Sequence, residues 1–263
     1  MVLRVERSHS GQVVTATLNR PRRFNALNSE LVRELHRLLD SLNDDFVARV
    51  LILVGAGPSF CAGADIKEAA GADGPPPDTQ QYENQRKFSS LIVKMRRIPQ
   101  IIIAGVQGSA AGGGMALALA ADIRIAGKSS KFIPSFVHLG LSGAELGTSY
   151  FLPRLVGLSL ATEFLVTAEP VNATRALETR LVSHVVFDED ILWRCTSLAE
   201  NIVATTSRAG LVFTKQALNA SVSATNLESQ IDFEDRQQLY CLKDEECRDF
   251  GIQHITRVTK AKL

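Results

Sequence analysis

The stretch 101–126, IIIAGVQGSAAGGGMALALAADIRIA, decides the fold. Ile101–Ala104 is an apolar, β-branched run, which predicts a strand that is buried on both faces. The small residues of Ala110–Ala121 predict a helix, and Asp122–Ala126 predicts a further strand. A strand, a helix and a strand in this order predict a right-handed crossover, and therefore parallel strands.

The same patterns continue on both sides of this stretch and predict an α/β fold with a mostly parallel sheet. Leucines over 31–42 predict a helix with Asn28 or Ser29 as its cap. Residues Ala69–Gln80 contain GADGPPP, which predicts a long surface loop. From Asp188 onward the chain is predicted to be helical, either as a subdomain or as a dimerisation element. The further predicted strands are Leu3–Val5, Val13–Leu18 and Val50–Val54, and the further predicted helices are Tyr82–Arg97, Leu158–Ala168, Asn172–Arg180, Asp188–Thr205, Arg208–Val222 and Asn226–Cys241.

The composition is that of an ordinary globular chain, with 263 residues of which 45% are hydrophobic and 22% are charged. This length suits one large domain with a buried core. The net charge of +1 argues against a nucleic-acid-binding surface. No apolar run approaches the ~20 residues that span a bilayer. The first residues lack the apolar core of a secretion signal, so we expect an intracellular protein.

The cysteines and the C-terminus also bear on the cellular compartment. Cys61, Cys195, Cys241 and Cys247 include no pair at metal-ligand spacing, so we expect four reduced thiols. Cys241 and Cys247 are six residues apart, and a single helix would not place them on one face. The chain ends with Ala-Lys-Leu at 261–263, which resembles a peroxisomal address. In a eukaryote this ending predicts import into the peroxisome or glycosome, and otherwise we expect a cytoplasmic protein.

Two glycine-rich turns follow buried strands at the same relative position, and each is followed by a predicted helix. The first is SFCAGADIKE at 59–68, and the second is GSAAGGGMAL at 108–117. Small residues let the backbone approach a ligand, and N–H groups at the start of a helix favour negative charge. Two such turns could direct two donors at one oxygen, which is an oxyanion hole. Neither turn matches the dinucleotide fingerprint or the P-loop.

These turns also carry a family resemblance. FCAGADIK at 60–67 and the pattern GGGxxLxxxxDIR at 112–124 resemble two signatures of the crotonase (enoyl-CoA hydratase/isomerase) superfamily. The opening NRP at 19–21 with NAL at 25–27, and LPRLVG at 152–157, resemble two more of its motifs. They occur in family order and at family spacing over residues 1 to about 220.

The resemblance implies a spiral of ββα units over 1–187, which binds an acyl-CoA thioester, and a helical trimerisation region over 188–263. It implies that the N–H groups of Ala64 and Gly113 hold the thioester oxygen while an enolate forms. It also implies a trimer or a dimer of trimers, and it implies no cofactor besides the CoA of the substrate. The residues that it predicts to contact substrate or CoA are Ala62, Ala64, Asp65, Ile66, Gly112, Gly113, Phe136 and Leu141.

The sequence departs from the family at the two glutamates that hydratases use to add water. Their positions fall on Ala116 and Phe136, neither of which can transfer a proton. One carboxylate remains nearby, that of Glu145, for which we expect burial beside Phe136, Leu141 and Leu146. A single base suits a double-bond isomerase of fatty-acid β-oxidation. The alternatives are that Glu145 caps the following helix, that it holds water in a hydratase or hydrolase, or that the chain is an inactive CoA-binding paralogue.

Other polar residues near the motifs have structural interpretations. We expect Asp65 to cap its helix or to pair locally, Asp122 to be a buried structural partner and Arg154 to form a structural ion pair. His138 and Tyr150 are expected to be structural, whereas Lys215 is a candidate contact for a CoA phosphate. No metal, nicotinamide or flavin site is apparent in the sequence.

Overall fold

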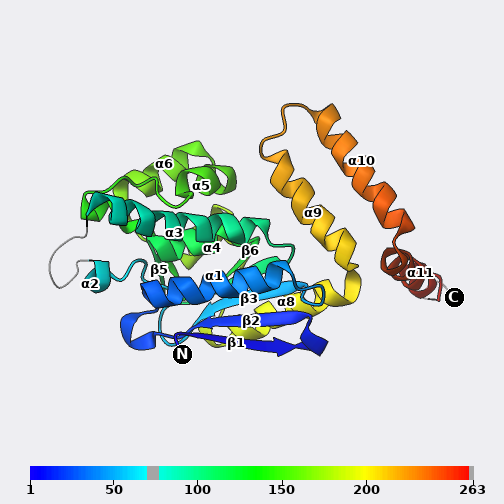
Figure 1. Cartoon of the computed structure of the whole chain (residues 1–263), viewed down its shortest axis with the longest axis horizontal. Coiled ribbons are helices and arrows are strands. Elements are labelled where there is room, and N and C mark those ends of the chain that lie inside the picture. The colour runs from blue at the N-terminus through cyan, green and yellow to red at the C-terminus, as the bar shows by residue number, and fades with distance from the viewer. Residues whose placement is uncertain (70–76, 261–263) are drawn as a thin grey trace.

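The computed structural model describes residues 1–69 and 77–260, and a six-stranded sheet is its central layer (Figure 1). The strand order is β1-β2-β3-β4-β6-β9. The first two strands are antiparallel and every later pair is parallel, as the sequence predicts. The strands are β1 (Leu3–Ser8), β2 (Val13–Leu18), β3 (Val50–Gly55), β4 (Ile101–Val106), β6 (Ile123–Gly127) and β9 (His184–Val186).

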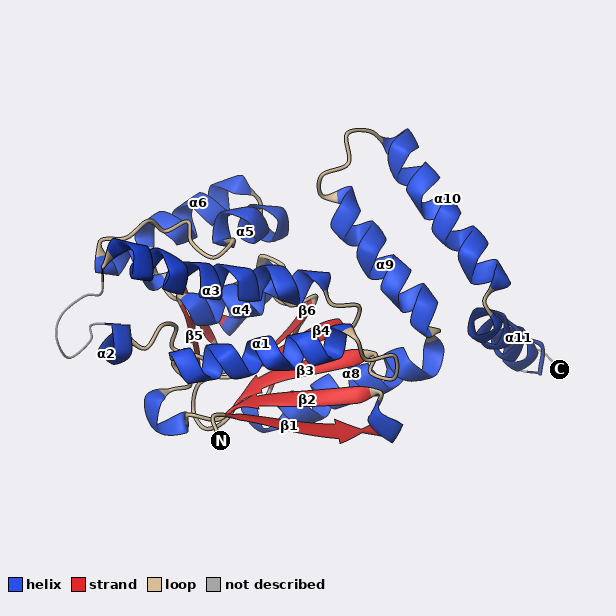
Figure 2. Ribbon diagram, viewed as in Figure 1, coloured by secondary structure: helices blue, strands red, loops and turns tan. Residues whose placement is uncertain are grey.

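Alternate residues of each central strand serve two separate hydrophobic layers. On β3, Leu51 and Leu53 join the core beneath α1 (Ser29–Asn43) and α3 (Asp78–Arg97). The intervening Ile52 joins a second cluster with α8 (Ile191–Thr205) on the opposite face. This alternation follows from the two-residue period of a strand, and helices on both faces explain why the run is apolar throughout. Figure 2 shows α1 and α3 on one side of the sheet and α8 behind it.

A second, smaller sheet lies beside the first and corrects one predicted element. It contains β5 (Ser109–Ala111), β7 (Lys131–Ile133) and β8 (Val171–Asn172). The predicted helix Ala110–Ala121 is therefore wrong at its start, because Ala110 and Ala111 pair with Phe132 and Ile133. The helix, α4 (Gly113–Ala120), begins only after this strand.

One further predicted boundary is confirmed, and another changes. Asn28 is the cap of α1, and its side chain accepts a hydrogen bond from the N–H of Leu31 at 3.0 Å. The predicted loop Ala69–Gln80 is shorter, since α2 (Ile66–Ala69) contains its first residue and α3 begins at Asp78. Residues 70–76 of that loop lie outside the described part of the chain.

The remaining helices are α5 (Thr148–Val156), α6 (Leu158–Thr167), α7 (Ala173–Glu178), α9 (Arg208–Ser221), α10 (Leu227–Lys243) and α11 (Glu245–Lys260). Of the region 188–263, α8 packs on the sheet through Ile191, Cys195 and Ala199. The later helices α9, α10 and α11 extend away from the sheet (Figure 1). Helix α9 still contacts the core through Leu211 and Lys215, which are buried, whereas α10 has no buried residue.

The C-terminal helices bring two cysteines together, contrary to the prediction of a single helix. The chain turns at Asp244, whose carboxylate accepts a hydrogen bond from the N–H of Cys247 in α11. Burial is the main cause that raises the pKa of the Cys241 thiol to about 11, and the hydrogen bond between the Cys241 and Cys247 thiols is a further one. All four cysteines are free, as predicted. The Ala-Lys-Leu ending lies outside the described residues, and no helix within them is both long and apolar enough to cross a bilayer.

Candidate active site

The first glycine turn is held by a short parallel bridge between Leu27 and Ala64. The N–H of Leu27 donates to the carbonyl of Gly63 at 2.7 Å, and the N–H of Asp65 donates to the carbonyl of Leu27 at 3.0 Å. The N–H of Ala64 itself donates to none of the described residues. Hydrogen bonds of Gly63 and Asp65, on either side of Ala64, therefore fix the turn and leave the Ala64 N–H available for a ligand.

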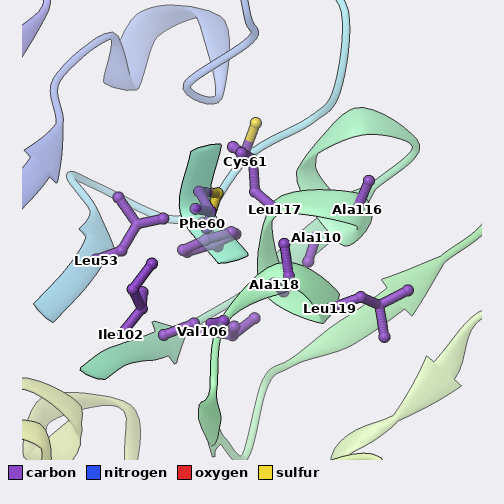
Figure 3. Packing of buried hydrophobic residues seen from close by; sticks show 14 of the residues in the cluster. Leu53, Phe60, Cys61, Ile102, Val106, Ala110, Ala116, Leu117, Ala118 and Leu119 are labelled. Carbon is purple, nitrogen blue, oxygen red and sulfur yellow. The ribbon is translucent and has the colours of Figure 1, made fainter. Parts of the chain in front are cut away.

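A second bridge, between Cys61 and Ala110, joins this turn to the other one. The N–H of Cys61 donates to the carbonyl of Ser109 at 3.0 Å, and the N–H of Ala111 donates to the carbonyl of Cys61 at 2.9 Å. Figure 3 shows Phe60 and Cys61 among the buried side chains of α4 and of Ala110.

Gly113 is the first residue of α4, so its N–H has no partner within the helix. It donates to no other described residue either. Gly63 packs against its nitrogen and so places the Ala64 and Gly113 donors on adjoining turns. Two free N–H groups on touching backbones, one of them at a helix start, form the arrangement expected of an oxyanion hole. The structure thus places the two predicted donors on adjoining turns, and their convergence on one thioester oxygen stays a prediction.

Asn25 holds the segment that leads into the first turn by buried hydrogen bonds. The sequence does not predict it as a site residue. It is fully buried, and its amide nitrogen donates to the carbonyls of Ala56 at 2.9 Å and Ser59 at 2.7 Å. Its amide oxygen accepts from the N–H of Arg20 at 2.8 Å. The signal for this role was its place in the motif NRPxxxNAL.

Asp65 has a structural partner, as predicted, but the partner lies 45 positions away in the sequence. Its carboxylate also accepts a hydrogen bond from the N–H of Glu68 in the helix that follows, as a cap would. Its carboxylate lies 2.8 Å from the Arg20 guanidinium, and the hydrogen bond from Arg20 is the main reason that the pKa of Asp65 is lowered. The carboxylate is therefore committed to a structural pair. A contact between Asp65 and CoA stays a prediction.

The other predicted contact residues divide into an exposed and a buried group. The side chains of Ala62, Ala64, Ile66 and Leu141 are exposed and therefore accessible to a ligand. Phe136 is buried, and its ring lies 3.5 Å from the position that a Cβ would take at Gly112. An aromatic ring, rather than a carboxylate, thus borders the second turn.

Glu145 lies outside the following helix, in a loop whose next residue reaches the second turn. The Leu146 side chain lies 3.5 Å from the position that a Cβ would take at Gly113. Glu145 is half-buried, and one carboxylate oxygen accepts a hydrogen bond from Gln85 of α3 at 2.7 Å. The alternative in which Glu145 caps α5 is wrong, because Gly147 occupies the cap position and no side chain bonds there. The expected burial beside Leu141 is wrong as well, since Leu141 is 55% exposed.

Comparison with known proteins identifies the family. The family model described as Enoyl-CoA hydratase/isomerase matches residues 8–257. The chain belongs to the enoyl-CoA hydratase/isomerase family. A probable enoyl-CoA hydratase, echA12, of Mycobacterium leprae is 39% identical over 232 residues, which is 87% of this chain and 79% of that protein. The 1,2-epoxyphenylacetyl-CoA isomerase of Escherichia coli is 37% identical over 229 residues, 86% of each chain.

Solved structures of the family share the fold. A probable enoyl-CoA hydratase/isomerase from Mycobacterium abscessus has a TM-score of 0.88 at 32% identity, covering 100% of this chain and 96% of its own. A monofunctional enoyl-CoA isomerase from M. smegmatis has a TM-score of 0.74 at 35% identity, covering 88% of this chain and 98% of its own. The predicted crotonase-type α/β fold with C-terminal helices is therefore confirmed.

In this member of the enoyl-CoA hydratase/isomerase family, Ala116 lies fully buried in α4 and Phe136 is buried beside Gly112. Both are apolar, so neither of the positions to which the resemblance assigns the hydratase glutamates holds an acid or a base; that assignment stays a prediction. Glu145 stays the only predicted acid–base residue. The described residues include no group of three or more His, Cys, Asp or Glu side chains that could hold a metal ion.

Lys215 is not available to a CoA phosphate, and that prediction is corrected. Its side chain is 3% exposed, and its ammonium group lies 2.9 Å from the Asp122 carboxylate. Burial is the main cause that lowers the pKa of Lys215. Asp122 also accepts from Arg96 at 2.6 Å, which confirms that it is a structural partner, although its side chain is half-buried rather than buried. A lone lysine in a helix gives no sign of this burial, which depends on a carboxylate far away in the sequence.

Arg154 forms no ion pair with any described carboxylate, so that prediction is wrong. Its guanidinium lies 4.1 Å from the centre of the Tyr150 ring and donates to the Tyr150 carbonyl at 2.7 Å. The Tyr150 ring also makes an edge contact with Phe151, in agreement with its predicted packing role. His138 is exposed, on a 3-10 turn at Ser135–Leu139.

Proposed function

We propose that the chain is an enoyl-CoA double-bond isomerase in which Ala64 and Gly113 bind the thioester oxygen and Glu145 moves a proton. One observation carries this proposal. Glu145 is the one carboxylate of the described loop 140–147, which contacts the second turn through Leu146. Apolar Ala116 and Phe136 stand where the family resemblance places the hydratase glutamates. One base without a partner suits a proton shuttle better than the addition of water.

The reaction begins with a 3-enoyl thioester whose oxygen accepts hydrogen bonds from the Ala64 and Gly113 N–H groups. Glu145 removes a proton from C2, and the electron pair moves into a dienolate whose negative charge lies mainly on that oxygen. Glu145 then returns the proton at C4, and the double bond forms between C2 and C3. Each donor stabilises the charged intermediate, and the loss of one such donor typically costs about 2.7–4 kcal/mol of barrier.

The relatives support both this reaction and a second candidate. A structural relative is a monofunctional enoyl-CoA isomerase, and a relative at 37% identity isomerises 1,2-epoxyphenylacetyl-CoA. The M. leprae relative is named a probable hydratase. The second candidate is therefore a hydratase, or a thioester hydrolase, in which Glu145 holds the attacking water. Both candidates use CoA as part of the substrate and need no metal, nicotinamide or flavin.

Assays of trans-3-enoyl-CoA and trans-2-enoyl-CoA on the wild type and on Glu145→Gln test the proposal. We expect the 3-enoyl substrate to be isomerised and Glu145→Gln to lose that activity by about 10²–10⁴-fold, as is usual for an acid–base residue. Glu169→Gln is the matched control, because Glu169 is exposed and belongs to neither turn. Hydration of the 2-enoyl substrate that Glu145→Gln abolishes would favour the second candidate. Binding without turnover would leave an inactive CoA-binding paralogue.

Self-association as a trimer or a hexamer is part of the proposal. Helices α10 and α11 extend from the core and carry exposed apolar side chains, which favour burial against another copy. Those more than half exposed are Leu227, Leu239, Tyr240, Leu242, Ile252 and Ile255. Light scattering on the full chain checks this, and a monomeric mass at micromolar concentration would contradict it.

A further inference from the structure

Gln85 is the side chain that holds the Glu145 carboxylate. The two residues are 60 positions apart, and the Gln85 amide nitrogen donates to Glu145 Oε1 at 2.7 Å. No other described side chain or N–H group hydrogen-bonds this carboxylate. The orientation of the amide is fixed by chemistry, because an amide oxygen facing an ionised carboxylate would repel it.

The backbone of Glu145 is held independently by Thr148, which is buried. The N–H of Glu145 donates to Thr148 Oγ1 at 3.1 Å, and the N–H of Thr148 returns a bond to the Glu145 carbonyl at 2.9 Å. Thr148 Oγ1 also donates to the carbonyl of Gly143 at 3.1 Å. The loop thus fixes the main chain of Glu145, and among the described residues only Gln85 hydrogen-bonds its carboxylate.

We infer that Gln85 is a positioning residue for Glu145, one that holds Oε1 so that Oε2 is left to exchange the proton with substrate. This inference rests on the proposed function. A hydrogen bond donated to a carboxylate favours its ionised form, which is the form that a base must have. An amide cannot accept the proton itself, and it can keep its bond to Oε1 while Oε2 is protonated. Gln85 therefore suits a base that must release the proton again.

The test is the pH dependence of kcat/KM for isomerisation of trans-3-enoyl-CoA by Gln85→Leu and Gln85→Glu. For Gln85→Leu we expect kcat at pH 7 to fall by about 10- to 100-fold, with little change in KM, because a hydrogen bond to a charged group is lost. We also expect the acid limb of the profile to move to higher pH. For Gln85→Glu we expect a larger move in the same direction, since two adjacent carboxyl groups share a proton.

Gln80→Leu is the matched control, because Gln80 lies on the same helix and bonds Asn84 of that helix. Its pH profile is expected to equal that of the wild type. If Glu145→Gln abolishes activity while both Gln85 variants keep the wild-type profile, the role of Gln85 is overturned and the proposed function stands. Equal losses of kcat in Gln85→Leu and Gln80→Leu would also overturn the role of Gln85, because they would show that any substitution on this surface of α3 lowers activity. If Glu145→Gln keeps full activity, the proposed function itself fails.

Discussion

Gly63 lies against the backbone nitrogen of Gly113. A methyl group at Gly63 would stand 3.3 Å from that nitrogen and 2.7 Å from the carbonyl oxygen of Ala111. Gly63 also has a φ of +90°, which other residues rarely adopt. The close approach of the two turns, and with it the spacing of the Ala64 and Gly113 donors, therefore requires a residue without a side chain at position 63.

Gly63→Ala is expected to move the two donors apart and to lower activity more than stability. The displacement of one donor predicts a loss of about 10²–10³-fold in kcat. The backbone strain predicts a loss of about 1–3 kcal/mol in the free energy of unfolding. Turnover of an enoyl-CoA and denaturant unfolding measure the two effects.

The control for this variant is Gly11→Ala. Gly11 has a similar φ of +88°, but its added methyl group would meet nothing closer than 3.4 Å, and it lies in the turn between β1 and β2. Gly11→Ala should lose a similar free energy of unfolding to Gly63→Ala and keep full activity. If both variants were equally active, the contact between the two turns would have no part in catalysis.

Lys215→Met tests whether this lysine is structural. The substitution leaves Asp122 with Arg96 but removes a buried charge partner at 2.9 Å, so we expect a loss of about 3 kcal/mol in the free energy of unfolding. Affinity for an acyl-CoA should stay the same, because the lysine does not reach the surface. Urea unfolding and calorimetric titration check the two outcomes. Lys243→Met, at an exposed position, is the control. A tenfold loss of acyl-CoA affinity in Lys215→Met but not in Lys243→Met would support the original prediction that Lys215 contacts a CoA phosphate.

The sequence predicts most of the central sheet and both glycine turns, because their signals are local. Val50–Val54 and Ile101–Ala104 are apolar in every position, which only strands buried on both faces require. Small residues directly after such strands predict the two turns. By contrast, Ala110 and Ala111 resemble the helix that follows them, and only pairing with β7 makes them a strand.

The parts of the site that could not be predicted depend on contacts between distant segments. Gln85 lies on an exposed helical surface, and its sequence neighbours give no sign of Glu145, 60 residues later. The burial of Lys215 depends in the same way on Asp122. The contact of Cys241 with Cys247 depends on the break at Asp244, between α10 and α11, which the sequence pattern does not predict.

Asp65→Asn should lower stability at neutral pH and have little effect in acid. The hydrogen bond from Arg20 is the main reason that the pKa of Asp65 in the folded chain lies below its ordinary value of 3.8. A carboxyl group with a lowered folded pKa stabilises the fold above its unfolded pKa, and this contribution is lost as the pH falls through the folded pKa. At pH 7 we expect Asp65→Asn to cost about 1.5–3 kcal/mol, because a charged hydrogen bond is lost and Arg20 stays partly buried without its partner.

Urea unfolding of the wild type and Asp65→Asn at several pH values between 7 and 2 checks this. The difference in the free energy of unfolding should be constant down to about pH 4 and then shrink, because the wild type also loses the charge. Glu34→Gln is the control, since Glu34 pairs with Arg37 on an exposed helical surface, where such pairs contribute about 0.5 kcal/mol or less. A difference that stays the same down to pH 2 would show that the charge of Asp65 does not stabilise the first turn.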